Sequence, residues 1–429
     1  MRVKVIGGGL AGCEACYQLL KRGISTSLYE MRPNISTGAH KTSNLAELVC
    51  SNSFKSIAPN TPQGILKCEL AELDSLILKV ANATKVPSGS ALSVDRELFS
   101  KEIEKTLNSF TNFQLIREEV TQIDDYSIIA TGPLSSPKIC EAIKKTTGSK
   151  FLNFYDAISP IIEADSINMD KAFYATRYGK GDADYLNCGM TKEEYTNFRK
   201  ELIAGEKVIL REFESKDIFE GCIPIEELAR RGEDTMRYGP LRPVGLIDNE
   251  GRKYYAVVQL RKENILSEMY NMVGFQTNLK YKEQERIFRL IPALTDAEFV
   301  RLGSMHKNIY VDSPRILDAT LKLKNASTIF FAGQIVGVEG YMESTSMGLL
   351  AGINMARLVN NLDLLIFSPK TMIGGLANYI ANEPGQFRPM GANIGLLEGL
   401  ENINKKTRKE IAMENSAREI NNIISTSFK

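Results

Sequence analysis

Cys222 has a sequence setting that could make its sulfur a nucleophile. It lies in Gly-Cys-Ile-Pro, two residues before Pro224, and Pro224 with Glu226 and Glu227 predicts the start of a helix. The dipole of a helix stabilises a thiolate near its N-terminus, and a thiolate is the form that attacks at neutral pH. The pattern therefore indicates covalent chemistry at Cys222.

A second isolated cysteine, Cys50, ends the apolar stretch of LAELVCSNSFK. Hydroxyl and amide side chains follow it, and Lys55 is nearby, so its thiol would lie among polar donors that favour a thiolate. The structural alternative for Cys50 is a small buried cysteine.

An arginine cluster lies directly after Cys222, in ELARRGEDTMRYGPLRP. It contains Arg230, Arg231, Arg237 and Arg242, with a tyrosine and two prolines between them. A charged helix in solvent is the simple interpretation of such a run. Beside a reactive cysteine, it also fits binding of phosphate or carboxylate groups.

The elements at the N-terminus predict a β-α-β unit that binds a dinucleotide. Val3 to Ile6 reads as a buried strand, Leu10 to Lys21 has the apolar spacing of a helix, and Ser25 to Tyr29 is the next strand. Between the first strand and the helix stands Gly7-Gly8-Gly9-Leu10-Ala11-Gly12, and Glu30 ends the second strand. In such a loop the first glycine makes the tight turn, the second lets the backbone approach a pyrophosphate, and the third lets the helix lie on the sheet. Glu30 would accept hydrogen bonds from ribose hydroxyls.

Cys13 and Cys16 form a C-x-x-C pair inside this predicted helix. Gly12, Cys16 and Leu19 share the face toward the sheet, where small side chains allow close packing. We therefore interpret the pair as packing and not as a redox dithiol.

Two later segments favour FAD over NAD as the resident nucleotide. Tyr126 to Gly132 is a buried strand that runs into Ala-Thr-Gly, and Thr328 to Gly333 is a second such strand. Gly337, Gly340, Gly348 and Gly352 follow the second strand through an expected helix, which would close over the flavin. An ordinary buried strand is the alternative for each segment alone.

The expected fold class is α/β, a Rossmann-type FAD-binding domain like that of glutathione reductase, with an inserted α+β domain. Residues 1–150 and 301–429 form the discontinuous FAD-binding domain, and residues 151–300, in which aromatic and charged residues alternate, form the inserted substrate- or RNA-binding domain. A charged helix is expected from Thr191 to Ala204, and residues 405–416 predict a polar, solvent-exposed helix.

Composition excludes several functional classes. Fifty-three Lys and Arg against 52 Asp and Glu give a net charge of +1, so a polyanion would have to meet a local basic patch. No secretory leader and no membrane span is expected, which places the protein in the cytoplasm. Seven scattered cysteines and two histidines, His40 and His306, predict neither a disulfide framework nor a metal site.

Several long motifs together resemble one family, the folate- and FAD-dependent tRNA uracil-5 methyltransferases (TrmFO family). They are VIGGGLAGCEA, LYEMRP, LAELVCSNS, VPSGSALSVDR, DYLNCGMTKEEY, FEGCIPIEELARRGEDTMRYGPLRPVGL, MHKNIYVDSP, FFAGQIVGVEGYMES and QFRPMGANIGLL, and they cover essentially the whole chain. The motifs add five residues to the expected cofactor-binding set: Arg32, Gly333, Gln334, Gly340 and Tyr341.

The resemblance implies a specific reaction. In this family 5,10-methylenetetrahydrofolate supplies a one-carbon unit, reduced FAD carries and reduces it, NAD(P)H regenerates the flavin, and the target is a T-loop uridine of tRNA. Cys222 matches the nucleophile that attacks the uracil ring, and Cys50 matches a second functional cysteine with an acid–base role. Lys55, Glu343 and the four arginines are candidates for contacts with RNA or substrate.

Some positions depart from the family pattern and leave alternatives open. The segment AHKTSN lacks a second histidine after His40, Lys55 replaces the usual arginine, and Ser88-Gly89-Ser90 replaces a turn richer in alanine and glycine. These departures leave a uridine of 23S ribosomal RNA as an alternative target. A flavin disulfide reductase and a non-catalytic RNA-binding flavoprotein are further alternatives.

Overall fold

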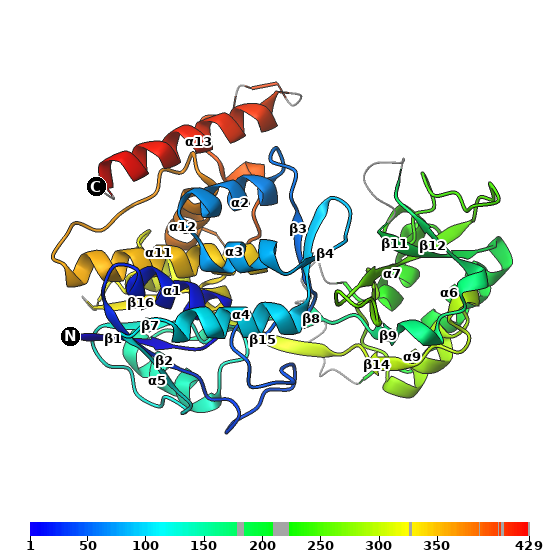
Figure 1. The fold of residues 1–429 in the computed structure, drawn as a ribbon, viewed down its shortest axis with the longest axis horizontal. Helices are drawn as coiled ribbons and strands as arrows, with labels where there is room; N and C mark the ends of the chain where they lie inside the picture. The colour runs from blue at the N-terminus through cyan, green and yellow to red at the C-terminus, as the bar shows by residue number, and fades with distance from the viewer. Residues whose placement is uncertain are drawn as a thin grey trace.

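A parallel sheet of five strands carries the N-terminal glycine loop (Figure 1). The computed structural model describes residues 1–177, 184–208, 223–325, 328–385, 387–401, 403–404 and 407–427. The strands in spatial order are β16 (Ile329–Phe331), β7 (Ser127–Ile129), β1 (Arg2–Ile6), β2 (Ser25–Tyr29) and β6 (Phe113–Ile116). Val5 in β1 pairs with Leu28 in β2 on one side and Ile128 in β7 on the other, and all three are fully buried. Strand β1 therefore has a parallel apolar strand on each side, as predicted for the first strand of a sheet that binds a dinucleotide.

Helices cover this sheet and a small second one. The small sheet contains β3 (Ser53–Ser56), β5 (Ala91–Val94) and β4 (Lys85–Val86). The helices of this part are α1 (Leu10–Leu20), α2 (Pro62–Glu72), α3 (Leu76–Ala83), α4 (Arg96–Asn108), α5 (Pro137–Thr147), α10 (Ser313–Ile316), α11 (Tyr341–Val359), α12 (Met372–Asn382) and α13 (Arg408–Ser427).

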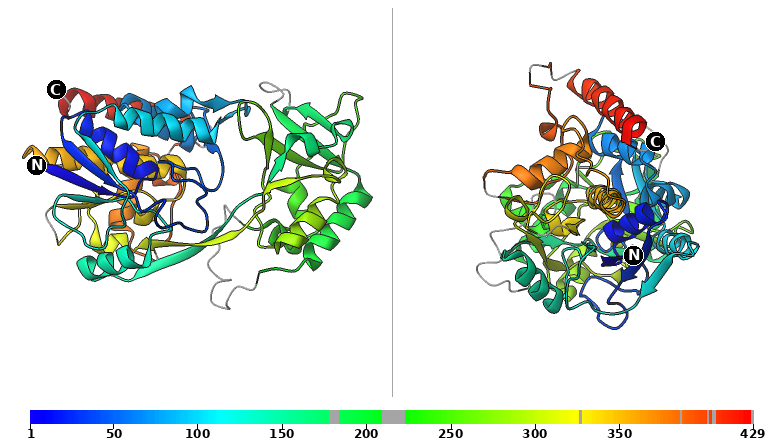
Figure 2. Two further views of the ribbon diagram at one scale, coloured as in Figure 1. Left: turned by 60° about the horizontal axis from the view of Figure 1, so that its bottom comes forward. Right: turned by 90° about the vertical axis from the view of Figure 1, so that its left-hand side faces the viewer.

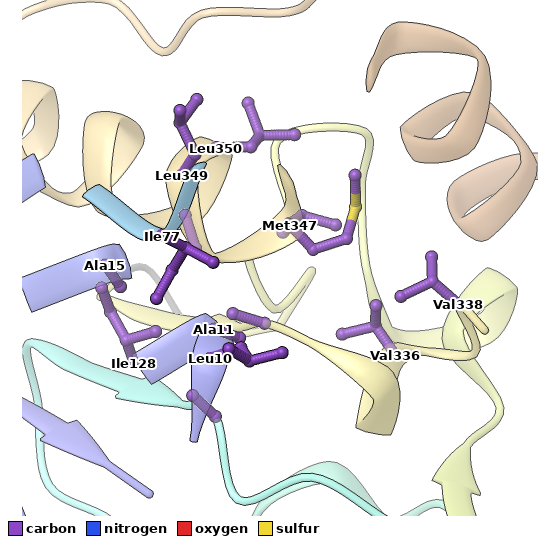
Figure 3. Packing of buried hydrophobic residues seen from close by; sticks show 14 of the residues in the cluster. Leu10, Ala11, Ala15, Ile77, Ile128, Val336, Val338, Met347, Leu349 and Leu350 are labelled. Carbon is purple, nitrogen blue, oxygen red and sulfur yellow. The ribbon is translucent and has the colours of Figure 1, made fainter. Parts of the chain in front are cut away.

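Helices α1 and α11 pack closely because α11 presents glycines to α1. A Cβ at Gly348 would overlap the backbone of Ala11, and a Cβ at Gly352 would meet Ala15 at 2.8–2.9 Å. Figure 3 shows Ala11 and Ala15 of α1 in one apolar cluster with Leu349 of α11. This packing sets the position of the first turns of α1 against the middle of α11.

A six-stranded sheet with its own helices forms the second body of the fold (Figure 1). Its strands in spatial order are β10 (Ala172–Ala175), β11 (Tyr185–Met190), β12 (Ala256–Lys262), β13 (Met269–Met272), β9 (Ile161–Glu163) and β14 (Phe299–Arg301). Helices α6 (Lys192–Ala204), α7 (Ile225–Arg231), α8 (Thr235–Tyr238) and α9 (Tyr281–Phe288) accompany it. A separate apolar cluster lies between this sheet and these helices.

A two-stranded antiparallel ribbon joins the two bodies, as Figure 2 shows. The chain leaves the first body along β8 (Phe151–Ala157) and returns along β15 (Met305–Val311). The chain passes between the two apolar clusters along this ribbon. The predicted domain division, with residues 1–150 and 301–429 in one domain and residues 151–300 in the other, stays a prediction. Within the described ranges, no helix has both the length and the apolar character needed to span a membrane.

Some predicted elements differ from the structure. Gly337 and Gly340 precede helix α11 with positive φ angles of 88° and 124°, so the predicted helix begins only at Tyr341. The predicted helix at residues 405–416 runs instead from Arg408 to Ser427. One side of it, with Ala412, is buried and faces α2, so the prediction of a solvent-exposed helix was wrong on that side.

Glu69 of α2 fastens helices α12 and α13 to the first body. Its carboxylate accepts hydrogen bonds from the backbone N–H groups of Met372 and Ile373 (2.8 Å for Ile373) and from the hydroxyl of Ser416 (2.6 Å). Burial raises the pKa of the Glu69 carboxyl to about 7, although these three donors lower it. The side chain is 2% exposed.

We expect Glu69→Gln to lower the melting temperature and to change its pH dependence. A Glu69 pKa above that of the unfolded chain stabilises the fold at low pH, and this contribution is lost as the pH rises from about 4.5 to about 7, at about 1.4 kcal/mol per pKa unit. The variant should lack this slope and should lose about 2 kcal/mol of stability because the amide cannot accept from all three donors. Thermal unfolding of both proteins at several pH values measures the loss of stability and its pH dependence. The same pH dependence in the two proteins would contradict a raised pKa of Glu69 in the folded chain.

Candidate functional site

The glycine loop has the geometry that a pyrophosphate requires. Gly7 has φ of 107°, and a Cβ at Gly12 would overlap the Gly7 carbonyl oxygen, so both positions need glycine for the turn itself. Gly9 has ordinary dihedral angles, and no atom would lie within 4 Å of a Cβ added there, so its open side can admit a ligand. It is the N-cap of α1 and no side chain caps this helix, which leaves the first N–H groups to face an anion.

Glu30 and Arg32 are bound to each other at the end of β2. Arg32 donates through its backbone N–H (3.0 Å) and its Nε (2.9 Å) to one Glu30 oxygen, and the N–H of Gly8 donates to the other (2.9 Å). Burial opposes ionisation of Glu30, but the hydrogen bonds and charge of Arg32 outweigh it, so the pKa of the Glu30 carboxyl is below its ordinary value. Arg32 also pairs with Glu47 at 2.8 Å. Glu30 is thus held as a carboxylate next to the glycine loop.

A cavity of about 1020 Å³ lies at the carboxyl ends of β1, β2 and β7 and contains the predicted cofactor residues. Its lining includes all members of that set except Gly12 and Gly340, namely Gly7, Gly8, Gly9, Leu10, Ala11, Glu30, Arg32, Gly333, Gln334 and Tyr341. His40, which the sequence did not place in the site, also lines it, and its Nδ1 is 2.6 Å from the hydroxyl of Thr37. Segments from both ends of the chain therefore form one elongated site.

A second cavity of about 1310 Å³ adjoins the first and contains Cys50. The two share Val49, Pro133, Leu134, Gln334 and Tyr341 in their linings. The second is also lined by the predicted substrate residues Lys55 and Glu343 and by Gly340. A molecule bound in the first cavity can therefore face the Cys50 side of the second.

Tyr341, the first residue of α11, holds the Cys50 segment. Its hydroxyl oxygen accepts hydrogen bonds from the backbone N–H groups of Cys50 (3.0 Å) and Ser51 (3.1 Å). Burial raises the pKa of the Tyr341 hydroxyl, and the negative charge of a Cys50 thiolate adds to this effect. The ring of Tyr341 packs on Phe54, with ring centroids 5.5 Å apart.

Glu343 is a buried carboxylate in the wall of the second cavity. It is 1% exposed, accepts a hydrogen bond from the N–H of Ala392 (3.0 Å), and is 3.9 Å from the Nζ of Lys55. A second cation, Lys67, also interacts with it: burial lowers the pKa of Lys67 to about 8, and the charge of Glu343 opposes that shift. The positive charges of Lys55 and Lys67 therefore favour the carboxylate form of Glu343 over the form that has accepted a proton.

The four predicted arginines lie on α7, on α8 and in the segment that follows α8. Cys222 is outside the described residues, and the predicted helix after Pro224 is present as α7, from Ile225 to Arg231. Arg230, Arg231 and Arg242 are exposed.

Arg237 is held by its neighbours in the second body. Its guanidinium pairs with Asp234 at 2.6 Å and lies 3.6 Å from the ring centre of Tyr255. These contacts fix the position of the Arg237 guanidinium, and its predicted role in binding RNA or substrate stays a prediction, as do those of the exposed Arg231 and Arg242.

Comparisons with known proteins bear on the whole chain. A family model described as "Glucose inhibited division protein A" matches residues 2–363. A methylenetetrahydrofolate--tRNA-(uracil-5-)-methyltransferase TrmFO from Natranaerobius thermophilus is 52% identical over 415 residues, covering 96% of each chain. The protein of the same name from Dictyoglomus thermophilum is 53% identical over 430 residues, covering 99% of this chain and 98% of the relative. This chain belongs to the TrmFO family.

A solved structure supports the fold of this TrmFO-family chain. GidA from Aquifex aeolicus has a TM-score of 0.70 at 17% identity, covering 98% of this chain and 73% of that one. At that identity the similarity concerns the fold alone, and it confirms the predicted class, an α/β flavoprotein fold with an inserted domain.

The residues of this TrmFO-family chain fit FAD. The open side of Gly9 and the uncapped start of α1 suit a pyrophosphate, Glu30 suits a ribose, and the uncapped start of α11 at Gly340 lies in the wall of the second cavity. Cys13 and Cys16, in contrast, are both fully buried in the apolar cluster, and burial raises the pKa of each thiol. The pair is placed as packing, as predicted.

Three arginines around Cys50 were missed from the sequence. Arg96, Arg261 and Arg301 all bind the Cys50 segment although they are far from it along the chain. The one available signal was the placement of Arg261 next to Leu260 near the end of the strand AVVQLRK, which begins with an apolar run. No spacing rule links it to Cys50.

Proposed function

We propose that this chain methylates C5 of a T-loop uridine in tRNA, with 5,10-methylenetetrahydrofolate as the one-carbon donor, FAD as resident cofactor and NAD(P)H as the reductant of the flavin. The observation that carries the proposal is the pair of adjoining cavities, one built for a dinucleotide and the other lined by Cys50. The names of the full-length relatives support the folate donor and the tRNA substrate.

The reaction needs a nucleophile because uracil C5 is unreactive until something adds to C6. In the proposal the Cys222 thiolate forms a bond to C6, and the C5–C6 π electrons move onto the C4 carbonyl to give an enolate. After C5 has gained the one-carbon unit, a base takes the C5 proton, and the electrons of that C–H bond break the bond between the one-carbon unit and the nitrogen that carries it, which leaves a methylene group on C5. When bound and reduced by NAD(P)H, the flavin would supply the hydride that converts this methylene into a methyl group. The enolate electrons that result re-form the C5–C6 double bond and expel the Cys222 thiolate.

Cys50 is the proposed acid–base partner in this sequence of steps. Cys50 is half-buried and lines the second cavity together with the shared residue Tyr341. A thiolate there can accept a proton at Sγ and return it when the products leave. Glu343 is the second carrier of a proton in the same wall, paired with Lys55.

The target uridine must leave its loop to reach the second cavity. Tyr238 is 82% exposed, lies between the exposed Arg231 and Arg242 along the chain, and offers a stacking surface for a base. Mapping 5-methyluridine by mass spectrometry in RNA from cells that lack the gene tests the target. The proposal predicts loss of the T-loop 5-methyluridine of tRNA. Loss confined to 23S ribosomal RNA would contradict the tRNA assignment, and retention in both RNAs would contradict the function.

We expect the double replacement of Arg231 and Arg242 by alanine to lower the affinity for tRNA and also to make that affinity less dependent on salt concentration. Each lost phosphate contact should lower the slope of log affinity against log salt by about one. Arg418→Ala, on helix α13 in the first body, is the matched control and should bind tRNA as the unsubstituted protein does. A titration series in increasing KCl measures the slope, and equal slopes for all three proteins would exclude this surface.

A further inference from the structure

The backbone of the Cys50 segment is held by guanidinium groups from distant parts of the chain. Arg96 donates to the carbonyl oxygens of Leu48 and Cys50, the latter at 3.4 Å. Arg301 donates to the carbonyl oxygen of Val49 at 2.6 Å. With the two N–H groups bound by Tyr341, this segment has little backbone freedom left.

A third arginine holds the residues that follow. Arg261 donates to the hydroxyl of Ser51 (2.8 Å) and to the side-chain oxygen of Asn52 (3.0 Å). Asn52 in turn donates to the carbonyl oxygens of Val94 (3.0 Å) and Lys262 (2.9 Å), so it ties both bodies together. We call Arg96, Arg261 and Arg301 the arginine clasp.

The clasp comes mainly from the six-stranded sheet. Arg261 belongs to β12 and Arg301 ends β14, whereas Arg96 begins α4 of the first body and pairs with Glu263, directly after β12, at 2.6 Å. The position of Cys50 therefore depends on how the second body sits against the first.

The charges of the clasp are not balanced by carboxylates. Glu263 pairs with Arg96, but among the residues that the structure describes no carboxylate pairs with Arg261 or Arg301. Arg261 is only 7% exposed and Arg301 is half-buried. A buried cation without an anion is costly, so an anion nearby would stabilise the arrangement.

Other charged groups near Cys50 compensate the three arginines only in part, since the single carboxylate of Glu263 pairs with Arg96 and acts more weakly on Arg301. In the same cavity wall, the charges of Lys55 and Glu343 pair with each other at 3.9 Å. Burial raises the pKa of the Tyr341 hydroxyl, so this group keeps its proton. Burial and the like charge of Arg96 lower the pKa of Arg301, and the charge of a Cys50 thiolate opposes this shift, followed by smaller effects of Tyr341 and of the Glu263 carboxylate. The Cys50 thiolate is the anion that these cations favour.

We propose that the arginine clasp positions Cys50 and keeps its sulfur in the thiolate form, with Arg301 and Arg261 as positioning residues supplied by the second body. The inference rests on the proposed function for its catalytic consequence but not for its chemical test. Its direct consequence is a Cys50 thiol that ionises more readily than an ordinary cysteine.

Arg301 is the residue to change, because its removal leaves no described carboxylate unpaired. Alkylation of the flavin-loaded protein by iodoacetamide, followed by peptide mass spectrometry over a range of pH, gives the pH midpoint for Cys50. The exposed Cys68 gives a reference in the same molecule. Arg301→Met should raise the Cys50 midpoint by about one pH unit, and Arg301→Lys, which keeps the charge and one donor, should restore most of that shift. The Cys68 midpoint should stay constant in all three proteins.

Catalysis gives an independent measurement. Arg301→Met should lower kcat for tRNA methylation about 10-fold, with the KM for tRNA and the flavin content within about twofold of the unsubstituted protein. An unchanged Cys50 midpoint in Arg301→Met would overturn the inference. Absence of methylation by the unsubstituted protein would refute the proposed function and would leave the alkylation comparison valid.

Discussion

Cys50→Ser is expected to abolish tRNA methylation, lowering the rate about 1000-fold or more, because an alcohol does not form the anion that a thiol forms at neutral pH. The substitution should leave the site otherwise intact. Tyr341, Arg96 and Arg301 bind the backbone of this segment and not the sulfur. Flavin content should therefore match that of the unsubstituted protein, whereas the melting temperature should fall somewhat because the variant has no thiolate beside the buried arginines.

The matched control for this variant is Cys140→Ser. Cys140 is also half-buried, its sulfur lies 3.7 Å from the carbonyl oxygen of Ser135, and it lines neither the first nor the second cavity. It should methylate tRNA normally in a single-turnover assay with quantification of 5-methyluridine. More than about a tenth of normal activity in Cys50→Ser would show that Cys50 takes no part in proton transfer.

Gly9→Ala is expected to cost about 100-fold in FAD affinity, which corresponds to about 2.7 kcal/mol. The dihedral angles of Gly9 (φ −79°, ψ −171°) suit alanine, and no atom lies within 4 Å of the added Cβ. The methyl group would occupy the side that the pyrophosphate must approach. The loss should therefore appear in the cofactor titration and not in the stability of the flavin-free protein.

Gly12→Ala provides the contrast. Its Cβ would overlap the Gly7 carbonyl oxygen whether or not a ligand is bound, so this variant should lose stability in the flavin-free protein as well. Fluorescence titration with FAD and thermal unfolding of both flavin-free variants separate the two effects. Normal FAD affinity in Gly9→Ala would place the dinucleotide elsewhere.

Local pattern and spacing predicted the nucleotide-binding part of the fold well. The strand at Val3 to Ile6, the glycine loop and Glu30 lie within one short β-α-β unit, so the contacts that define them are local. The helix expected from Thr191 is also present, since Thr191 and Glu194 form a capping box at its start. Such signals are legible because the interacting residues are neighbours in the chain.

The surroundings of Cys50 could not be predicted in the same way. Tyr341 lies 291 residues from Cys50, and Arg301 lies 252 residues from Val49. These contacts depend on how two sheets and the ends of the chain come together, which no local pattern records. The buried side of α13 was missed for the same reason, because its partner Glu69 is 347 residues from Ser416.

Carbon transfer to RNA is the most direct test of the proposed function. The purified flavin-loaded protein would be incubated with an unmodified tRNA transcript, NADPH and 5,10-methylenetetrahydrofolate carrying ¹³C in the methylene group. The proposed function predicts ¹³C in the methyl group of 5-methyluridine at the T loop, and none when the folate is omitted. Absence of 5-methyluridine, or a methyl group without ¹³C, would contradict it.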